Sequence, residues 1–305
     1  SAYPIAVTCE IVNTKAVLRS RPAISDTHGV RPMHTPAPLT LSLVLSVSMT
    51  IATHFSFGQD LGATDGPTAT QPVPTQALER WQSMRFGMFI HWGPVSLKGT
   101  EIGWSRGREV PVDEYDQLYR EFNPIKFDAG AWVSTAKKAG MKYLVITAKH
   151  HDGFCLWDSQ NTEYDIMSTP YKTDILRALS DACRKQDMMF CTYHSICDWY
   201  HPDYPLGSPG GRTVKDNPNM ARYVDYLHRQ VAETVRKYGP LGIMWFDGEW
   251  EKPWTHEMGV DMYQYLRTLQ PDMLINNRVD KGRRGMEGTT ASDDFLGDYD
   301  TPEQR

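Results

Sequence analysis

The chain has 305 residues, of which 40% are hydrophobic and 23% charged, a composition typical of a globular protein with one large core. Its formal net charge of -5 is mild for this length, and no basic face stands out, which excludes nucleic acid as an expected partner. The five cysteines are odd in number and irregularly spaced, so the sequence predicts no disulfide framework and no C-x-x-C zinc site. Cys191 lies in an apolar run and is expected to be a buried small hydrophobic residue.

Residues 1–58 read as an upstream, signal-peptide-like segment. Leu39 to Ala52 is apolar, carries no charge and has about the length of a secretory hydrophobic region. It is too short to span a bilayer, which needs roughly 20 residues. Met33 is a candidate start, and cleavage is expected between Ala52 and Gln59. The alternative is a buried or disordered N-terminal segment. We expect a secreted or periplasmic protein whose mature form has no membrane span.

Residues 59–76 are rich in Pro, Thr and Gly and are predicted to form a linker. From residue 77 to residue 305 strand and helix patterns alternate, which indicates one folded domain. Asp128 is expected to cap a helix through Ala139, and Asn217 is the expected cap of a later helix. The strands are predicted at 86–92, 142–147, 188–193, 242–246 and 272–276, and the other helices at 173–186, 218–238 and 260–269.

Alternating strands and helices imply a parallel sheet with right-handed crossovers, closed as a barrel or open and doubly wound. No Gly-rich phosphate loop follows the first strand, which counts against a dinucleotide-binding sheet. Residues 77–305 fall short of the roughly 250 residues of a (β/α)8 barrel. The pattern also gives five strands, with a sixth at 295–299. The sequence therefore predicts an α/β fold, a (β/α)8-like barrel that is C-terminally truncated.

Each predicted strand ends in a cluster of polar and aromatic residues. Barrels of parallel strands build their active sites from these C-terminal ends, so the clusters are expected to meet at one rim. Flat tryptophan faces beside polar groups suggest a sugar-binding pocket. Successive side chains of a strand point to opposite sides, so both histidines of one cluster reach the pocket only if the backbone turns there, as Gly153 would permit. The clusters are His91-Trp92, His150-His151-Asp152, Tyr193-His194-Ser195, Asp247-Gly248-Glu249-Trp250 and Asn276-Asn277-Arg278.

Six segments in this order resemble the α-L-fucosidases of glycoside hydrolase family 29, over roughly residues 78–303. The segments are FGMFIHWG (86–93), EYDQLYREFNP (114–124), AKKAGMKYLVITAKHHDGFCLWDS (136–159), DWYHPDY (198–204), WFDGEWE (245–251) and INNR (275–278). The resemblance implies a retaining exo-α-L-fucosidase in a (β/α)8-like barrel, acting on terminal fucose of a fucosylated glycan without metal or another cofactor. It does not extend to the N-terminal residues.

Carried over residue by residue, the resemblance makes Asp247 the nucleophile. The residues that match sugar-binding positions of the family are His91, His150, His151, Tyr193 and Arg278. Glu101 and Trp104 are the nearest match to an upstream Glu-Trp pair that touches the sugar, although their spacing differs from that of the family.

Two assignments are open for the acid/base that a retaining glycosidase needs about 5–5.5 Å from its nucleophile. Some family members use a Glu in a Thr-Pro-Glu stretch, which matches Glu303, and others use a Glu that would lie beyond Arg305. Glu249, two residues after Asp247, is held as a substitute acid.

Plainer interpretations stand beside these assignments. Asp247 could cap a loop, His91 could be a satisfied core histidine, and Arg278 could pair a carboxylate at the barrel rim. The run Lys281 to Gly285 is predicted to be a solvated loop rather than an anion site. Two other functions compete with the leading one. They are a non-catalytic fucose-binding fragment, and a metal-dependent hydrolase that uses the cluster of His150, His151 and Asp152.

Overall fold

The computed structural model describes residues 73–303. Its sheet has five parallel strands whose order in space follows their order along the chain. The predicted segments 1–58 and most of 59–76 lie outside the described residues, and so does Cys9. The strands are β1 (Gly87–Ile90), β2 (Tyr143–Lys149), β3 (Met189–Ser195), β4 (Ile243–Asp247) and β5 (Leu274–Ile275).

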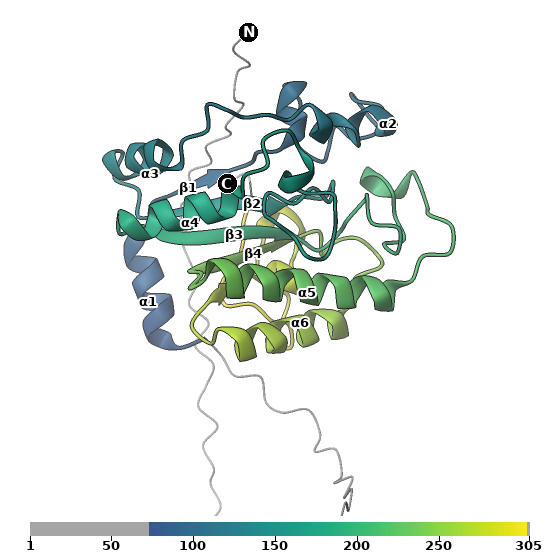
Figure 1. Cartoon of the computed structure of the whole chain (residues 1–305). Helices are drawn as coiled ribbons and strands as arrows, with labels where there is room; N and C mark the ends of the chain where they lie inside the picture. The colour runs from purple at the N-terminus through teal and green to yellow at the C-terminus, as the bar shows by residue number, and fades with distance from the viewer. Residues whose placement is uncertain (1–72, 304–305) are drawn as a thin grey trace, which may run out of the picture. The chain divides into compact units, whose positions relative to one another are not determined.

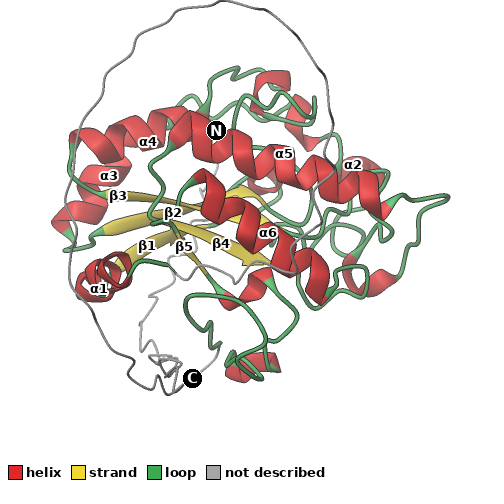
Figure 2. Cartoon of the chain, turned by 90° about the horizontal axis from the view of Figure 1, so that it is seen from below, coloured by secondary structure: helices red, strands yellow, loops and turns green. Residues whose placement is uncertain are grey.

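Helices alternate with these strands, and the first begins at Thr75, two residues before the expected start of the domain. Helices α4, α5 and α6 lie on one face of the sheet, whereas α1 lies on the other (Figures 1 and 2). The α-helices are α1 (Thr75–Met84), α2 (Val112–Tyr115), α3 (Ala129–Lys138), α4 (Ile175–Lys185), α5 (Met220–Tyr238) and α6 (His256–Leu269).

Side-chain caps determine where several helices begin. Asp128 accepts a hydrogen bond from the Ala131 N–H and caps α3 as predicted. The cap of α5 is Asn219, which accepts from the Arg222 N–H, so the prediction of Asn217 is wrong. Asn217 adopts a left-handed conformation with φ 52° and lies outside the helix. Helix α6 starts at His256, before the predicted residue 260, because Thr255 caps it.

The two faces of the sheet bury different side chains, since successive strand residues point in opposite directions. Ile146 and Phe246 belong to the outer core, which the sheet shares with α3 to α6. Val145, Cys191 and Tyr193 belong to the inner core, together with Trp81 of α1. Cys191 is buried, as predicted, and its thiol is free, like those of the other described cysteines.

The strand order decides between the two predicted closures. A doubly wound sheet reverses its order at a switch point, whereas these five strands never reverse, as expected for a barrel. The predicted sixth strand at 295–299 is present as a single parallel bridge between Asn276 and Tyr299. Tyr299 also packs on Trp81 of α1, with ring centroids 4.5 Å apart. Within residues 73–303 the protein therefore has the strand arrangement of a (β/α)8-like barrel.

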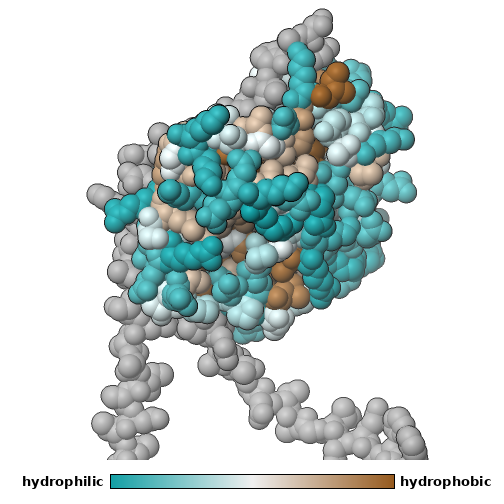
Figure 3. All heavy atoms as spheres, turned by 60° about the vertical axis from the view of Figure 1, so that its left-hand side comes forward, coloured by the Kyte–Doolittle hydropathy of each residue, from teal (hydrophilic) through white to brown (hydrophobic). Residues whose placement is uncertain are grey.

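On the face seen in Figure 3 hydrophilic residues surround separate apolar areas. Within the part of the chain that the structure describes, no helix is both long enough and apolar enough to cross a membrane.

Candidate active site

The candidate site lies at the C-terminal edge of the parallel sheet. Asp247 ends β4, opposite Ser195 at the end of β3, and Tyr193 lies two residues earlier on β3. His150 and His151 directly follow β2, and Arg278 follows β5 within a short helical turn at Asn277–Val279. Four segments that are distant in sequence thus bring these side chains to one edge, as the strand-end pattern predicts.

The Asp247 carboxylate is held from both of its oxygens. The Tyr193 hydroxyl donates to Oδ2 at 2.8 Å, and Arg278 Nη1 donates to Oδ1 at 2.6 Å. The Asp247 side chain is 17% exposed, so one side of it still faces solvent. A carboxylate fixed in this way points in one direction and carries its negative charge beside a guanidinium. A ligand can therefore reach this carboxylate from its open side.

Both histidines after β2 reach the site, because the backbone turns at Gly153, which has φ 81°. The His150 ring stacks on Tyr193, with centroids 5.2 Å apart and planes 6° from parallel. His151 Nε2 lies 3.6 Å from Asp247 Oδ2. Burial lowers the pKa of both histidines well below the usual value, helped by the neighbouring ring for His150 and by Arg278 for His151. Both imidazoles are therefore neutral at pH 7.

The hydrogen bonds around His151 fix which of its nitrogens carries the proton. The Ser195 hydroxyl donates to the Cys197 carbonyl, so it accepts from His151 Nδ1, which lies 2.6 Å away. Nε2 is then an acceptor, and it is buried without a hydrogen-bond partner among residues 73–303. A ligand hydroxyl would satisfy this atom, as sugar binding requires.

His91 joins the same cluster from the end of β1. Its ring lies 4.7 Å from Phe89, 5.7 Å from His150 and 5.8 Å from Tyr193, measured between centroids. His91 is half-buried, so its ring lines the site instead of filling the core. Its position therefore favours the site over the core interpretation.

The structure separates the two residues of the predicted upstream pair. Trp104 lies against His151 at 5.4 Å and stacks on Trp250 at 6.1 Å. Glu101 is exposed, and its side chain makes no hydrogen bond or ion pair with the described residues. The loop that carries Trp104 is fixed by Tyr115, which accepts from the Gly103 N–H and donates to Asp152. Trp104 thus belongs to the site, whereas the role of Glu101 stays a prediction.

Glu303 also reaches the site, through arginines. Its carboxylate contacts Arg278 Nη2, and Arg283 Nη2 lies 3.2 Å from its Oε1. The Glu303 side chain is 43% exposed, so it faces solvent while Arg278 connects it to Asp247. One guanidinium therefore contacts both Asp247 and Glu303, the latter being one of the two candidates for the acid/base.

The sequence profile of the family described as alpha-L-fucosidase matches residues 63–305. The chain belongs to the α-L-fucosidase family. It is 30% identical over 215 residues to alpha-L-fucosidase 1 of Arabidopsis thaliana, and the match covers 68% of this chain and 38% of the relative. It is 28% identical over 239 residues to the tissue alpha-L-fucosidase of Bos taurus, and the match covers 70% of this chain and 50% of the relative.

Two solved α-L-fucosidases support the same fold. Isoenzyme 1 from Paenibacillus thiaminolyticus is 38% identical with a TM-score of 0.60, covering 67% of this chain and 51% of that one. An enzyme from Bacteroides thetaiotaomicron is 32% identical with a TM-score of 0.65, covering 76% of this chain and 55% of that one. The (β/α)8-like barrel class is thereby confirmed. The chain spans about half or less of the length of these fucosidases.

Sequence reasoning missed the burial of three charged residues in this fucosidase-family site. Arg283 was placed in a solvated loop, which is wrong, because its side chain is 7% exposed and contacts Glu303. Lys281 of the same run is partly buried and donates to the Glu249 and Glu251 carbonyls. Their carboxylate partners come from other segments, so the local charge run gave no signal of burial.

Glu249 is the third case, because the sequence offers it only as a substitute acid and yet it is deeply buried. Its Oε2 lies 3.8 Å from Arg278 Nη1, and its Oε1 lies 3.9 Å from Arg283 Nη1. Burial, opposed by Arg278 and aided by the charge of Asp247, raises the pKa of Glu249 to about 7. Glu249 is therefore a buried carboxyl group near both arginines, and its raised pKa favours the protonated form more than in an ordinary Glu.

Two of the donor groups in the metal alternative have protein partners. His151 Nδ1 bonds to Ser195, and the Asp152 carboxylate accepts from the Tyr115 hydroxyl at 2.6 Å. Between residues 73 and 303, no group of three or more His, Cys, Asp or Glu side chains is arranged to hold a metal ion. The donor set after β2 thus fits hydrogen bonding to a ligand better than metal coordination.

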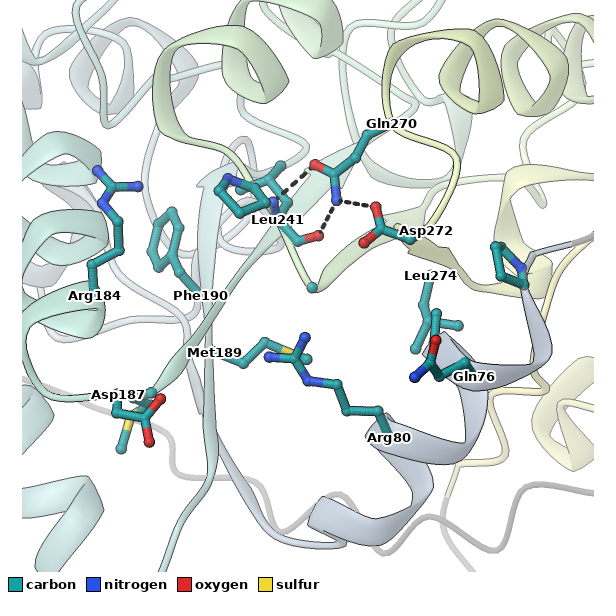
Figure 4. A pocket seen from close by; sticks show the side chains of 15 residues that line it. Gln76, Arg80, Arg184, Asp187, Met189, Phe190, Leu241, Gln270, Asp272 and Leu274 are labelled. Carbon is teal, nitrogen blue, oxygen red and sulfur yellow. Dashed lines mark hydrogen bonds between the residues drawn. The ribbon is translucent and has the colours of Figure 1, made fainter.

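A separate cavity of about 810 Å³ lies at the other end of the strands (Figure 4). It is lined by Arg80 of α1, Met189 at the start of β3 and Leu274, and by Gln270, whose amide bonds to the Leu241 backbone. In barrel enzymes the N-terminal end of the strands serves stability, and the chemistry lies at the C-terminal end. We therefore assign no catalytic role to this cavity.

Proposed function

We propose that the protein is a retaining exo-α-L-fucosidase that removes terminal α-L-fucose from a fucosylated glycan. The observation that carries this proposal is the position of Arg278 between two carboxylates. Its Nη1 donates to Asp247 at 2.6 Å, and its Nη2 contacts Glu303. Both carboxyl groups contact one guanidinium, so the fold brings together the two carboxyl groups that glycoside hydrolysis needs.

Asp247 acts as the nucleophile in this mechanism. Its carboxylate attacks the anomeric carbon of fucose while the bond from that carbon to the leaving oxygen breaks. Glu303 gives its proton to the leaving oxygen and then, as a carboxylate, takes a proton from water. That water attacks the anomeric carbon, releases Asp247 and gives fucose with its original anomeric configuration. Arg278 stabilises the carboxylate form of both residues as charge moves between them.

The sugar-binding roles follow from the positions of the other side chains. His151 Nε2 is a buried acceptor 3.6 Å from the Asp247 carboxylate, so we assign it a fucose hydroxyl near the reacting carbon. His91, His150 and Tyr193 surround the same space with their rings. Trp104 lies at its edge, with its ring 5.4 Å from His151 and stacked on Trp250 at 6.1 Å. Neutral imidazoles beside an anionic carboxylate suit the recognition of uncharged hydroxyls.

A relative supports the covalent step. The solved structure of a Bacteroides thetaiotaomicron enzyme is described as a trapped covalent intermediate with 2-fluoro-fucosyl fluoride. That enzyme is 32% identical to this chain, with a TM-score of 0.65, and the match covers 77% of this chain and 56% of that one. We carry the covalent mechanism over to Asp247 on this basis.

We further propose that the protein is secreted or periplasmic, on the strength of the apolar, uncharged run from Leu39 to Ala52. Expression of the chain with its N-terminal residues, followed by N-terminal sequencing of the mature protein, tests this. A mature N-terminus between Ala52 and Gln59 supports export, and an uncleaved intracellular product contradicts it.

The activity is tested by hydrolysis of an aryl α-L-fucoside, with the configuration of released fucose followed by nuclear magnetic resonance. We expect initial release of the α-anomer, and an Asp247→Ala variant at least ~10³-fold slower, since removing a nucleophile costs several kcal/mol of barrier. Fucose binding by calorimetry without turnover would instead support the non-catalytic fucose-binding fragment. Loss of activity on chelation with EDTA would favour the metal-dependent hydrolase.

A further inference from the structure

The Arg283 guanidinium is surrounded by oxygen atoms at the edge of the site. Its Nε lies 3.2 Å from the Thr301 carbonyl and 3.1 Å from the Thr301 hydroxyl, and its Nη2 donates to the carbonyl at 2.9 Å. Nη2 lies 3.2 Å from Glu303 Oε1, and Nη1 lies 3.9 Å from Glu249 Oε1. A planar guanidinium that is hydrogen-bonded through Nε and Nη2 is fixed in orientation as well as in position.

The backbone attaches Glu303 to the same loop that carries Arg283. The Glu303 N–H donates to the Met286 carbonyl at 3.0 Å, and the Thr301 N–H donates to the Gly288 carbonyl at 3.2 Å. Gly288 has φ 68°, and a Cβ added there would lie 2.1 Å from the Thr301 carbonyl oxygen. The loop that carries Arg283 and the segment from Thr301 to Glu303 therefore approach closely. The Arg283 side chain adds hydrogen bonds between them by donating to Thr301.

Arg278 and Arg283 both contact Glu303, but only Arg278 contacts Asp247. Arg278 donates to Asp247 and contacts Glu303, whereas Arg283 contacts Glu303 and makes no hydrogen bond or ion pair with Asp247. Loss of Arg278 would remove a direct partner of both Asp247 and Glu303, whereas loss of Arg283 would remove a direct partner of Glu303 and Glu249 but none of Asp247. Arg283 thus allows the two halves of the site to be separated by experiment.

We propose that Arg283 is a positioning residue that holds the Glu303 carboxyl group in place for proton transfer to and from the leaving oxygen. This inference rests on the proposed function, in which Glu303 is the acid/base. It assigns Arg283 to the proton-transfer step and leaves the attack by Asp247 intact.

The test compares two aryl α-L-fucosides in Arg283→Gln, with Arg284→Gln as the matched control. Arg284 is the exposed neighbour, and its guanidinium donates to the Ala291 carbonyl instead of a site carboxylate. A dinitrophenyl fucoside leaves without protonation, whereas the unsubstituted phenyl fucoside needs the acid. We expect Arg283→Gln to lose at least ~10-fold more kcat/KM on the phenyl substrate than on the dinitrophenyl substrate, and Arg284→Gln to match the wild type on both.

Two further variants keep the result interpretable. Arg283→Lys retains the charge but not the fork, so it should show a smaller version of the same split, and it carries the test if the glutamine variant does not fold. Glu303→Gln should show the largest difference between the losses of kcat/KM on the two substrates.

Equal losses on both substrates in Arg283→Gln would overturn the positioning role. Wild-type rates in Glu303→Gln would overturn it too and leave the fucosidase proposal standing, whereas a wild-type protein that cleaves neither substrate would defeat both.

Discussion

At the scale of single residues, Arg278 is the side chain that contacts both carboxylates of the site. It is the common partner of Asp247 and Glu303, and its Nε also donates to the Thr301 hydroxyl at 3.1 Å. Its side chain is 5% exposed, so its charge is little screened by water. A planar guanidinium reaches these partners at once, which a single ammonium group cannot do.

This geometry predicts different losses for two substitutions of Arg278. Arg278→Lys keeps a positive charge near Asp247 but gives up the fork, and we expect kcat/KM on an aryl fucoside to fall ~10²-fold. Arg278→Ala also leaves the carboxylates without a counter-charge, so we expect a loss of ~10³-fold or more. Steady-state kinetics measure both. A lysine variant as active as the wild type would refute the forked role of Arg278.

At the scale of elements, the turn after β4 determines where Asp247 and Glu249 point. Gly248 has φ 98°, and a Cβ added there would lie 2.8 Å from Cys197 Sγ and 2.9 Å from the Cys197 backbone nitrogen. Lys281 holds the following residues from the other side by donating to the Glu249 carbonyl at 2.5 Å and the Glu251 carbonyl at 2.9 Å. The turn is therefore tight on both sides and has little room to relax.

Gly248→Ala tests this packing, with Gly140→Ala as a matched control. Gly140 has a similar φ of 88°, but nothing lies within 4 Å of its added Cβ. We expect Gly140→Ala to lower the free energy of unfolding by about 1 kcal/mol through backbone strain alone. Gly248→Ala should cost about 2 kcal/mol more through the clash, and it should also lower activity by displacing Asp247. Chemical denaturation measures both, and equal costs would contradict the crowding.

At the scale of the whole molecule, the site brings buried like charges into the fold. Asp247 and Glu249 both lie near Arg278 Nη1, at 2.6 Å and 3.8 Å, and burial raises the pKa of Glu249 from 4.5 to about 7. A carboxyl group with a raised pKa binds its proton more tightly in the folded state than in the unfolded state. Its stabilising contribution is thus complete below pH 4.5 and is lost as the pH rises through 7.

Glu249→Gln is expected to change how stability depends on pH. Glutamine resembles the protonated carboxyl group at every pH. The variant therefore keeps the free energy of unfolding that the wild type loses when Glu249 ionises. Relative to the wild type, its free energy of unfolding should rise by about 3 kcal/mol between pH 4 and pH 8. Denaturant titrations across this range measure the difference. A difference that stays constant with pH would show that Glu249 does not titrate in this window.

Much of this fold and site follows from local sequence patterns. The five strands and the cap of α3 come from periodicity and side-chain chemistry near the element itself, and His151, Tyr193 and Asp247 follow from strand ends meeting at one edge. Features that depend on distant partners were missed. The burial of Arg283 requires Glu303 and Thr301, and the choice of Asn219 over Asn217 as the α5 cap depends on the preceding loop.

A covalent fucosyl ester at Asp247 is the central step of the proposed mechanism. The direct measurement is incubation of the wild-type protein with a fluorinated fucosyl fluoride that forms the intermediate quickly and releases it slowly, followed by peptide mass spectrometry. We predict a single fucosyl label on the peptide that contains Asp247, and no label in Asp247→Ala. A label on another side chain of the wild type, or turnover with inversion and no adduct, would contradict it.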